Sequence, residues 1–185
     1  MNWFALTVKP RHELAVAEQL AAKSLAAYVP LYRRRARWSD RVKIIETPLF
    51  PRYVFCRFQF EDRLKVLRTY SVSSIVGFNG VPCPISENEI ETVKRIALSS
   101  DVSIMPHPYG RVGQRVRICE GPLMGVEGIL EREKGTCRVV VTVEAMQRAI
   151  ALEIDANLLE PIEEPRTHRM PSMLPFRDNY LVLKP

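Results

Sequence analysis

The segment PLFPRYVFCRF, residues 48–58, restricts the possible folds of this chain more than any other stretch. A β-strand shows alternate side chains to opposite faces of its sheet. The apolar side chains expected to form the domain core are Phe50, Val54, Cys56 and Phe58. The opposite face then carries Pro51, Tyr53 and Phe55, which we expect to form an exposed apolar patch. An apolar second face needs its own cover, which is a partner protein, another helix of the chain or a second domain.

The composition indicates a globular protein without a membrane span. The 185 residues leave room for one large domain or two small ones, and the hydrophobic fraction of 46% is typical of a packed protein. No stretch approaches the ~20 apolar residues that a spanning helix needs. The N-terminal MNWFALTVKPRHE lacks the features of a secretory signal peptide. We therefore expect a cytoplasmic protein with no membrane contact.

The first hundred residues predict an α+β domain, in which an antiparallel sheet is flanked by helices. Strands are expected at 2–10, 28–35, 41–48, 48–58 and 72–78, and helices at 11–27, at 61–70 and from Ser86 onward. The first helix is expected to bury a stripe of Leu14, Ala17, Ala21 and Leu25, flanked by Val16 and Leu20. It is expected to expose Glu13, Glu18, Gln19 and Lys23. Ser86 and Glu89 fit a capping box at the start of the last helix.

The second half predicts a different architecture. Residues 100–109 are interpreted as a linker because they contain two prolines and little periodicity. Short strands separated by turns then predict a small SH3-like β-barrel at 110–161. Residues 162–185 are expected to form an extended tail, which gives an N-terminal domain at 1–99, a linker, a barrel and a tail.

Charge is distributed unevenly along the chain. Residues 1–100 contain 16 Lys and Arg against 9 Asp and Glu, a net charge of +7, whereas residues 101–185 contain 11 against 12, a net charge of −1. A basic half suits a polyanionic partner, and a nearly neutral half suits a protein partner.

The segment RRRARWSDRVK, residues 33–43, is strongly basic and is expected to surround a hairpin tip. Its cationic and aromatic residues are Arg33, Arg34, Arg35, Arg37, Trp38, Arg41 and Lys43. Clustered cations neutralise phosphates, and an aromatic ring stacks on an unpaired base. The pattern favours nucleic-acid binding, although a solvated charged surface has the same composition.

The sequence offers no set of residues for catalysis or metal binding. The four cysteines are widely separated, without a C-x-x-C pair, and are interpreted as small buried hydrophobes. His12, His107 and His168 fall outside any metal-binding motif, and no glycine-rich phosphate loop or nucleophile elbow occurs. We expect a protein that is not an enzyme and that uses no cofactor or metal ion.

Several motifs resemble the NGN domain of the NusG-type transcription elongation factors. They are Trp3, KPRHE at 9–13, PLFPRYVFCRF at 48–58, VSSIVGF at 72–78 and PISENEI at 84–90. Farther along, GQRVRICEGPLMGVEGIL at 113–130 resembles a KOW motif, so the resemblance covers residues 1–161. KPRHE, RRRARWSDRVK and PLFPRYVF look more like the specialised RfaH and UpxY-type members, which are operon-specific antiterminators.

The resemblance implies binding sites on the N-terminal domain. Pro51, Tyr53 and Phe55 would bind the clamp helices of the RNA polymerase β′ subunit. Arg63 and Lys65 would lie near the gate loop of the β subunit. The residues on the surface that meets non-template DNA in RfaH-like proteins are Lys9, Arg11, His12, Gln19 and Lys23. The basic hairpin would reach upstream DNA.

The resemblance also implies a role for the KOW domain. Its loop residues Pro122, Leu123 and Met124 would contact Rho or the small ribosomal subunit. The expected function is that of a monomeric factor that suppresses pausing or termination on specific operons. Two alternatives remain open: a housekeeping factor that works with Rho, and a KOW-type RNA-binding or ribosome-associated protein.

Overall fold

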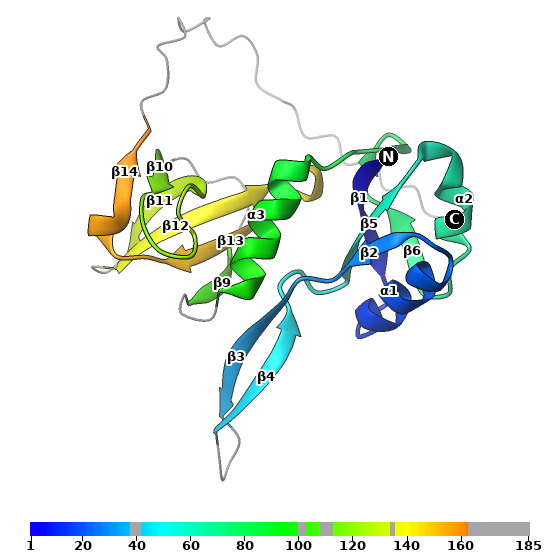
Figure 1. Ribbon diagram of the computed structural model, residues 1–185, viewed down its shortest axis with the longest axis horizontal. Helices are drawn as coiled ribbons and strands as arrows, with labels where there is room; N and C mark the ends of the chain where they lie inside the picture. Colours follow the sequence, from blue (N-terminus) through cyan, green and yellow to red (C-terminus); the bar gives the residue numbers. More distant parts are fainter. Residues whose placement is uncertain (38–41, 100–102, 108–112, 134–135, 163–185) are drawn as a thin grey trace, which may run out of the picture.

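The computed structural model describes residues 1–37, 42–99, 103–107, 113–133 and 136–162. Its elements form two units with helix α3 between them (Figure 1). The N-terminal unit contains β1 (Asn2–Val8), α1 (Glu13–Ala22), β2 (Ala26–Tyr28), β3 (Leu31–Arg37), β4 (Val42–Pro48), β5 (Tyr53–Phe58), the 3-10 turn η1 (Phe60–Asp62), α2 (Arg63–Leu67), β6 (Val72–Ile75), β7 (Gly77–Phe78), β8 (Val81–Pro82) and α3 (Glu87–Leu98). The C-terminal unit contains β9 (Ile104–His107), β10 (Gln114–Ile118), β11 (Glu127–Glu133), β12 (Thr136–Val143), η2 (Glu144–Met146), β13 (Arg148–Glu153), η3 (Ala156–Leu158) and β14 (Leu159–Pro161).

The N-terminal unit is built on a four-stranded sheet with the order β2-β5-β1-β6. Strand β1 pairs antiparallel with both β5 and β6, so it lies inside the sheet. Its alternate residues belong to two different buried clusters, so both of its faces are covered. On one face, Leu6 and Val54 join the α1 residues Val16 and Leu20 in a single cluster. This confirms the predicted α+β class and places β5, the strand of the PLFPRYVFCRF segment, between β2 and β1.

Helix α1 buries the predicted flank of its apolar stripe, Val16 and Leu20, rather than the centre of the stripe. Val16 and Leu20 are fully buried, whereas Leu14 is 53% exposed. Glu13, expected on the outer face, is only 6% exposed. Its carboxylate accepts a hydrogen bond from the Arg52 backbone N–H at 2.7 Å. The helix is therefore rotated so that its first-turn carboxylate satisfies a backbone donor in the turn before β5, a partner that local periodicity does not reveal.

Strands β3 and β4 form a separate two-stranded sheet that projects from the rest of the unit (Figure 1). The register pairs Arg33 with Glu46 and Arg37 with Val42. The predicted basic hairpin is thus present, and its tip, residues 38–41, lies outside the described residues.

The C-terminal unit is a six-stranded antiparallel sheet with the order β14-β10-β11-β12-β13-β9. It confirms a β-rich second half that is consistent with a KOW domain. Strand β9 pairs with β13 through Ile104–His107, so part of the segment interpreted as a linker belongs to this sheet. Gly128 permits close strand approach, because a Cβ there would lie 2.6 Å from the Val140 carbonyl oxygen.

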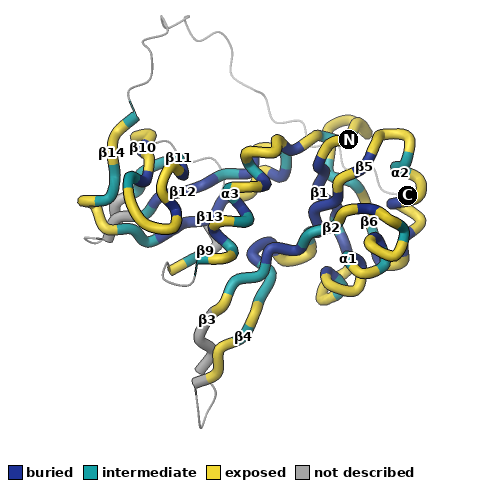
Figure 2. Tube along the Cα trace, viewed as in Figure 1, coloured by how far each residue is buried: buried dark blue, intermediate teal, exposed yellow. Residues whose placement is uncertain are grey.

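Helix α3 lies between the two units and contributes to the core of both. The predicted capping box is present: the Ser86 side chain accepts from the Glu89 N–H, and the Glu89 side chain accepts from the Ser86 N–H. Ile90, Val93 and Ile96 are buried in a cluster that contains side chains from both sheets. Figure 2 shows α3 as a helix with buried positions between the units. The two units therefore share one continuous hydrophobic cluster.

No helix in the described ranges is long and apolar enough to cross a membrane. The predicted extended tail lies outside the described residues beyond Ile162.

Candidate functional site

The apolar face of β5 is covered rather than exposed. Phe55 has no exposed surface, and its ring packs edge-on against Phe50 with ring centroids 6.0 Å apart. Tyr53 is partly buried and Pro51 is exposed. The expectation of an exposed patch is therefore wrong for Phe55, holds for Pro51 and holds in part for Tyr53.

The turn before β5 explains why Phe50 lies on the same side as Phe55. The Tyr53 N–H donates to the Phe50 carbonyl at 3.2 Å, and Arg52 has a left-handed φ of 71°. This turn breaks the strict alternation that the sequence suggested. Phe50 therefore joins the α3-side cluster, instead of the α1-side cluster that holds Val54, Cys56 and Phe58.

Tyr53 contacts the C-terminal unit directly. The Arg148 guanidinium donates to the Tyr53 hydroxyl at 3.3 Å and lies over its ring, 5.5 Å from the centroid. Arg148 itself is exposed. The aromatic ring predicted to meet a partner protein is thus covered, in this arrangement, by an exposed side chain of the other unit.

The loop before β11 also contacts the other unit. Leu123 is 1% exposed and packs in the shared cluster, which corrects its expected role as a surface residue. Pro122 is exposed and Met124 is 62% exposed. The Arg95 guanidinium, on α3, donates to the backbone carbonyls of both residues, at 3.2 Å for Pro122. Two of the three predicted loop residues therefore remain accessible, with their backbone held by α3.

A third polar contact between the units involves the α3 cap. One Glu89 oxygen accepts from the Ser86 backbone N–H at 3.0 Å, and the other accepts from the Glu144 backbone N–H at 3.2 Å. A cleft of about 970 Å³ lies alongside, lined by residues of α3 and of the C-terminal sheet. The sequence revealed the cap of this helix but not its second partner.

The predicted non-template DNA residues divide into two groups. Lys9 and Arg11 are exposed, and His12 is partly buried, with its Nδ1 atom 3.0 Å from the Ser71 hydroxyl. Gln19 donates to the Ala15 carbonyl of its own helix, and Lys23 donates to Thr69 Oγ1 at 2.6 Å. The structure thus groups the KPRHE residues at one sheet edge, and gives Lys23 a structural partner on the α2 side.

Tyr70 is a surface residue at this edge that the sequence analysis missed. It is 68% exposed, the Lys9 ammonium lies 5.3 Å from its ring centroid, and the His12 ring lies edge-on at 6.2 Å. Arg11 and Ser71 both have left-handed φ angles, of 65° and 71°. The position of Tyr70, two residues before a predicted strand, did not indicate a surface site, because only the fold brings its ring beside Lys9.

Near α2, Arg63 and Lys65 occupy different environments. The Arg63 guanidinium lies over the Phe60 ring at 4.5 Å, whereas Lys65 is exposed. Leu64 is 54% exposed and Phe60 is 48% exposed. This surface is therefore apolar as well as basic.

The basic hairpin is described in part. Arg33 forms an exposed ion pair with Glu46 at 3.4 Å, and Lys43 is exposed. Arg34, Arg35 and Arg37 lie on β3, but their side chains fall outside the description, as do Trp38 and Arg41 entirely. Ile44, which pairs with Arg35, is 64% exposed.

The β7–β8 hairpin presents a second apolar surface that sequence reasoning missed. Phe78 is 79% exposed and Val81 is 65% exposed. Val76, at the base of this hairpin, packs against the cluster that contains Phe55. The NG turn between two short apolar pairs is the sequence signal that would have indicated this hairpin.

Comparison with known proteins identifies the family. A family model described as transcription termination factor NusG matches residues 1–94, which is half of the chain. The chain belongs to the NusG family. A curated NusG from Lactococcus lactis is 27% identical over 180 residues, 88% of this chain and 94% of that protein. NusG from Haemophilus influenzae is 32% identical over 125 residues, 63% of this chain and 65% of that protein.

Solved structures support the fold. A structure concerned with domain interaction in Thermotoga maritima NusG matches with a TM-score of 0.54 and 22% identity, and covers 88% of this chain and 97% of that one. The antiparallel α+β unit followed by a β-rich unit is therefore a NusG-type arrangement. The narrower resemblance to RfaH and UpxY-type members stays a prediction.

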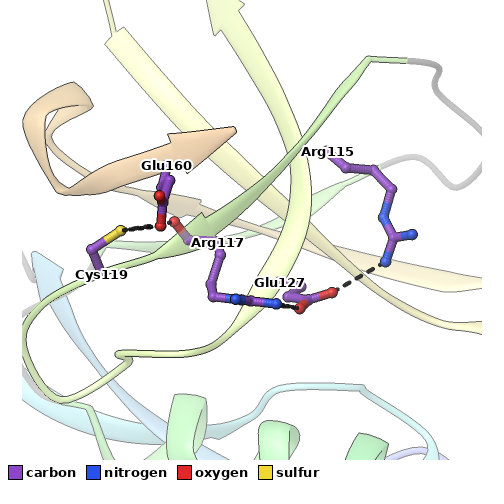
Figure 3. A network of polar contacts seen from close by, with 5 residues as sticks. All are labelled: Arg115, Arg117, Cys119, Glu127 and Glu160. Atoms are coloured by element: carbon purple, nitrogen blue, oxygen red, sulfur yellow. Dashed lines mark hydrogen bonds and ion pairs between the residues drawn. The ribbon is translucent and has the colours of Figure 1, made fainter. Parts of the chain in front are cut away.

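The C-terminal unit of this NusG-family chain carries an exposed polar network on β10 and β11 (Figure 3). Glu127 accepts from Arg117 at 2.6 Å and from Arg115 at 3.1 Å, and the bond from Arg117 lowers the pKa of the Glu127 carboxyl. Cys119 lies 3.7 Å from a Glu160 oxygen, and desolvation followed by this carboxylate raises the pKa of the thiol. A raised thiol pKa disfavours the nucleophilic thiolate, so the network fits a structural role.

Within the described ranges, no group of three or more His, Cys, Asp and Glu side chains could hold a metal ion. Cys56 is buried, whereas Cys83 and Cys119 are partly exposed, so among these three cysteines the expectation of burial holds for Cys56. The side chain of Cys137 lies outside the description.

Proposed function

We propose that this chain is a transcription elongation and antitermination factor that binds RNA polymerase through its N-terminal unit and performs no covalent chemistry. The observation that carries the proposal is the aromatic face of β5. Tyr53 and Phe55 belong to a strand with two apolar faces, and the cover on the Tyr53 side is a side chain of a separate unit. The names of the curated relatives, transcription termination/antitermination proteins, agree with this assignment.

The partner of this face is the coiled coil formed by the polymerase β′ clamp helices. A helical partner presents side chains of one face at i, i+3 and i+4 spacing, which suits an apolar patch such as this one. Pro51 and Tyr53 supply the accessible contacts, whereas Phe55 is fully buried against Phe50 of its own unit. Burying one such side chain contributes roughly 1.5–3 kcal/mol, so two or three anchors dominate a modest interface.

Contacts on the other side of the polymerase cleft involve α2. In this proposal Lys65 and Arg63 contact the gate loop of the β subunit. The exposed Leu64 and Phe60 are their apolar neighbours. A protein that bridges both sides of the cleft binds the closed clamp better than the open one. It therefore disfavours pausing by shifting the clamp equilibrium.

Nucleic-acid contacts involve two basic surfaces. The edge that contains Lys9, Arg11 and His12 faces the non-template strand, and the β3–β4 hairpin reaches upstream DNA. This proposal rests on exposed cations and on an accessible aromatic ring, Tyr70, at the same edge. Such contacts are screened by salt, so DNA affinity falls as ionic strength rises.

The C-terminal unit recruits a second partner, Rho or the small ribosomal subunit, through the loop around Pro122 and Met124. Its near-neutral charge suits a protein partner better than RNA. In the operon-specific form of the proposal, this unit fails to recruit Rho and antitermination results. In the housekeeping form the factor works with Rho. The curated relatives are named termination/antitermination proteins, and the word termination favours this form.

The experiment is a binding and pausing assay with the full chain. Tyr53→Ala should weaken binding to elongation complexes and reduce pause suppression, whereas Arg117→Ala, whose guanidinium bonds within its own sheet, should change neither. Equal binding by Tyr53→Ala and the unmodified chain contradicts the proposal. Rho capture and pausing on many unrelated templates then separate the housekeeping form from the operon-specific form.

A further inference from the structure

Three turns meet at one end of the N-terminal sheet. Strands β5, β1 and β6 are neighbours in the sheet (Figure 1) and run antiparallel, so the residues before β5, after β1 and before β6 lie at the same end. Backbone hydrogen bonds join these turns. The Val8 N–H donates to the Arg52 carbonyl at 2.9 Å, and the Lys9 N–H donates to the Ser71 carbonyl at 3.0 Å. Because adjacent strands are about 4.8 Å apart, the three turns form a surface only about 10 Å wide.

This surface carries positive charge without a counterion from the protein. The turns, residues 9–12, 50–52 and 69–71, contain three exposed cations, Lys9, Arg11 and Arg52, and no carboxylate. The adjacent Glu13 is buried, and its carboxylate accepts the Arg52 backbone N–H. Within the part of the chain that the structure describes, the guanidinium groups of Arg11 and Arg52 form no hydrogen bond or ion pair. Such a group of cations attracts a polyanion.

Arg52 is held in a backbone conformation that its Cβ disfavours. Its φ is 71°, and Arg11 and Ser71 are also left-handed, with φ angles of 65° and 71°. Glycine adopts this region without strain, whereas a residue with a Cβ does so at a cost. Strained residues of this kind cluster at binding sites, where the surrounding structure holds them. Hydrogen bonds to the N–H and the carbonyl of Arg52 fix the turn and leave its side chain available.

Tyr70 adds an aromatic ring to this cationic surface. The Lys9 ammonium and the His12 ring both contact the Tyr70 ring, and yet Tyr70 remains 68% exposed. An accessible aromatic ring beside cations is the arrangement that binds single strands, because the ring stacks on a base while the cations bind phosphates. In a duplex both faces of each base are covered by its neighbours, so the ring selects an unpaired base.

We propose that Arg52 and Tyr70 complete a binding site for a single strand of nucleic acid that crosses the ends of β6, β1 and β5. Tyr70 stacks on an unpaired base, and Lys9 and Arg52 bind phosphates of the same strand. The inference rests on the proposed function and deepens it, because it gives the proposed DNA edge two further residues and a strand that is unpaired. Arg52 directly precedes Tyr53, so the strand leaves this site beside the proposed polymerase anchor.

The first test measures the affinity of the full chain for a short single-stranded DNA oligonucleotide by fluorescence anisotropy at several salt concentrations. Each phosphate contact to a single strand contributes about 0.7 to the slope of log affinity against log salt concentration, so Arg52→Ala should reduce the slope by about 0.7. Arg57→Ala is the matched control, because it removes the same charge from the other end of β5, where Arg57 pairs with Glu87 at 3.8 Å. Equal slopes for the two variants overturn the inference.

Arg52→Gly separates DNA binding from folding. Glycine takes a left-handed φ without strain, so this variant should keep the turn and the Tm of the unmodified chain. Its affinity for the oligonucleotide should nevertheless fall as far as that of Arg52→Ala. If Arg52→Gly binds as tightly as the unmodified chain, the inference is wrong.

The second test concerns the base. Tyr70→Ala should weaken binding about fivefold or more without changing the salt slope, because it removes stacking but no phosphate contact, whereas Tyr70→Phe should bind like the unmodified chain. Unchanged affinity of Tyr70→Ala overturns the inference, as does a duplex of the same sequence that binds as tightly as the single strand. Tighter binding of DNA than of the same sequence as RNA supports the non-template strand, and the reverse assigns the site to the transcript and overturns the DNA edge.

Failure of this inference is distinguishable from failure of the proposed function. If Lys9→Ala weakens DNA binding and the Arg52 and Tyr70 variants do not, the proposed DNA edge stands and the inference fails. If those variants behave as expected while Tyr53→Ala still binds elongation complexes normally, the single-strand site stands and the polymerase assignment fails.

Discussion

Replacing the buried Phe55 of β5 by alanine should reduce stability much more than replacing the neighbouring Tyr53. The two variants therefore distinguish a residue needed for folding from one proposed to bind a partner. Phe55 is fully buried and packs edge-on against Phe50 in the cluster shared by the two units. Replacing a buried Phe by Ala removes the transfer free energy of the ring and leaves a cavity, at a cost of about 3–5 kcal/mol. Tyr53 is partly buried and its main partner is the exposed Arg148, so Tyr53→Ala should lower the free energy of unfolding by only about 1 kcal/mol.

The two variants differ most clearly in thermal unfolding. For a chain of 150–250 residues, each kcal/mol shifts Tm by about 2–4 °C, which predicts a loss of about 6–20 °C for Phe55→Ala. Circular dichroism measures Tm, and hydrogen exchange at Leu6 and Val54 reports whether the N-terminal sheet is the part that loosens. A Tm within about 2 °C of the unmodified chain for Phe55→Ala would show that the ring is not part of a packed interior, and would refute this reasoning.

Three further predictions concern other parts of the fold. Glu13→Ala should lower the free energy of unfolding by about 1–3 kcal/mol, because it leaves the Arg52 N–H without its acceptor. Glu18→Ala, on the exposed side of the helix, should cost little, and equal urea midpoints for the two variants would contradict this reasoning. Gly128→Ala should destabilise the C-terminal sheet by more than about 1 kcal/mol, since a Cβ there would lie 2.6 Å from the Val140 carbonyl oxygen. Unchanged hydrogen exchange of the β11 and β12 amides would show that the strands can separate without cost. Burial raises the pKa of the Cys56 thiol to about 12, so the stability that the neutral thiol contributes should be lost as pH rises from about 9 through 12, at up to about 1.4 kcal/mol per pH unit. The free energy of unfolding of Cys56→Ala should therefore fall less steeply with alkaline pH, and identical slopes for the two proteins would argue against a buried thiol.

Features set by neighbouring residues were predictable from the sequence. The capping box of Ser86 and Glu89 depends on a three-residue spacing, and the β3–β4 hairpin depends on two adjacent strands. The strand at 53–58 was predictable because its alternating residues are apolar on both faces. These signals sufficed for the α+β class, for the β-rich second half and for the family resemblance.

Features set by distant partners were not predictable. The burial of Phe55 and Leu123 depends on the packing of α3 against two sheets, and no local spacing encodes that packing. The burial of Glu13 depends on an amide 39 residues away. Strand β9 formed inside a proline-containing segment because β13 offered it a sheet edge. In each case a tertiary partner decided the outcome over the local pattern.

The central claim is that Tyr53 is an anchor for RNA polymerase, and the most direct test is the dissociation constant of the full chain for the β′ clamp-helix fragment. Loss of one aromatic anchor should weaken binding about tenfold or more in Tyr53→Ala, while Arg117→Ala binds like the unmodified chain. Equal dissociation constants for all three proteins would contradict the account.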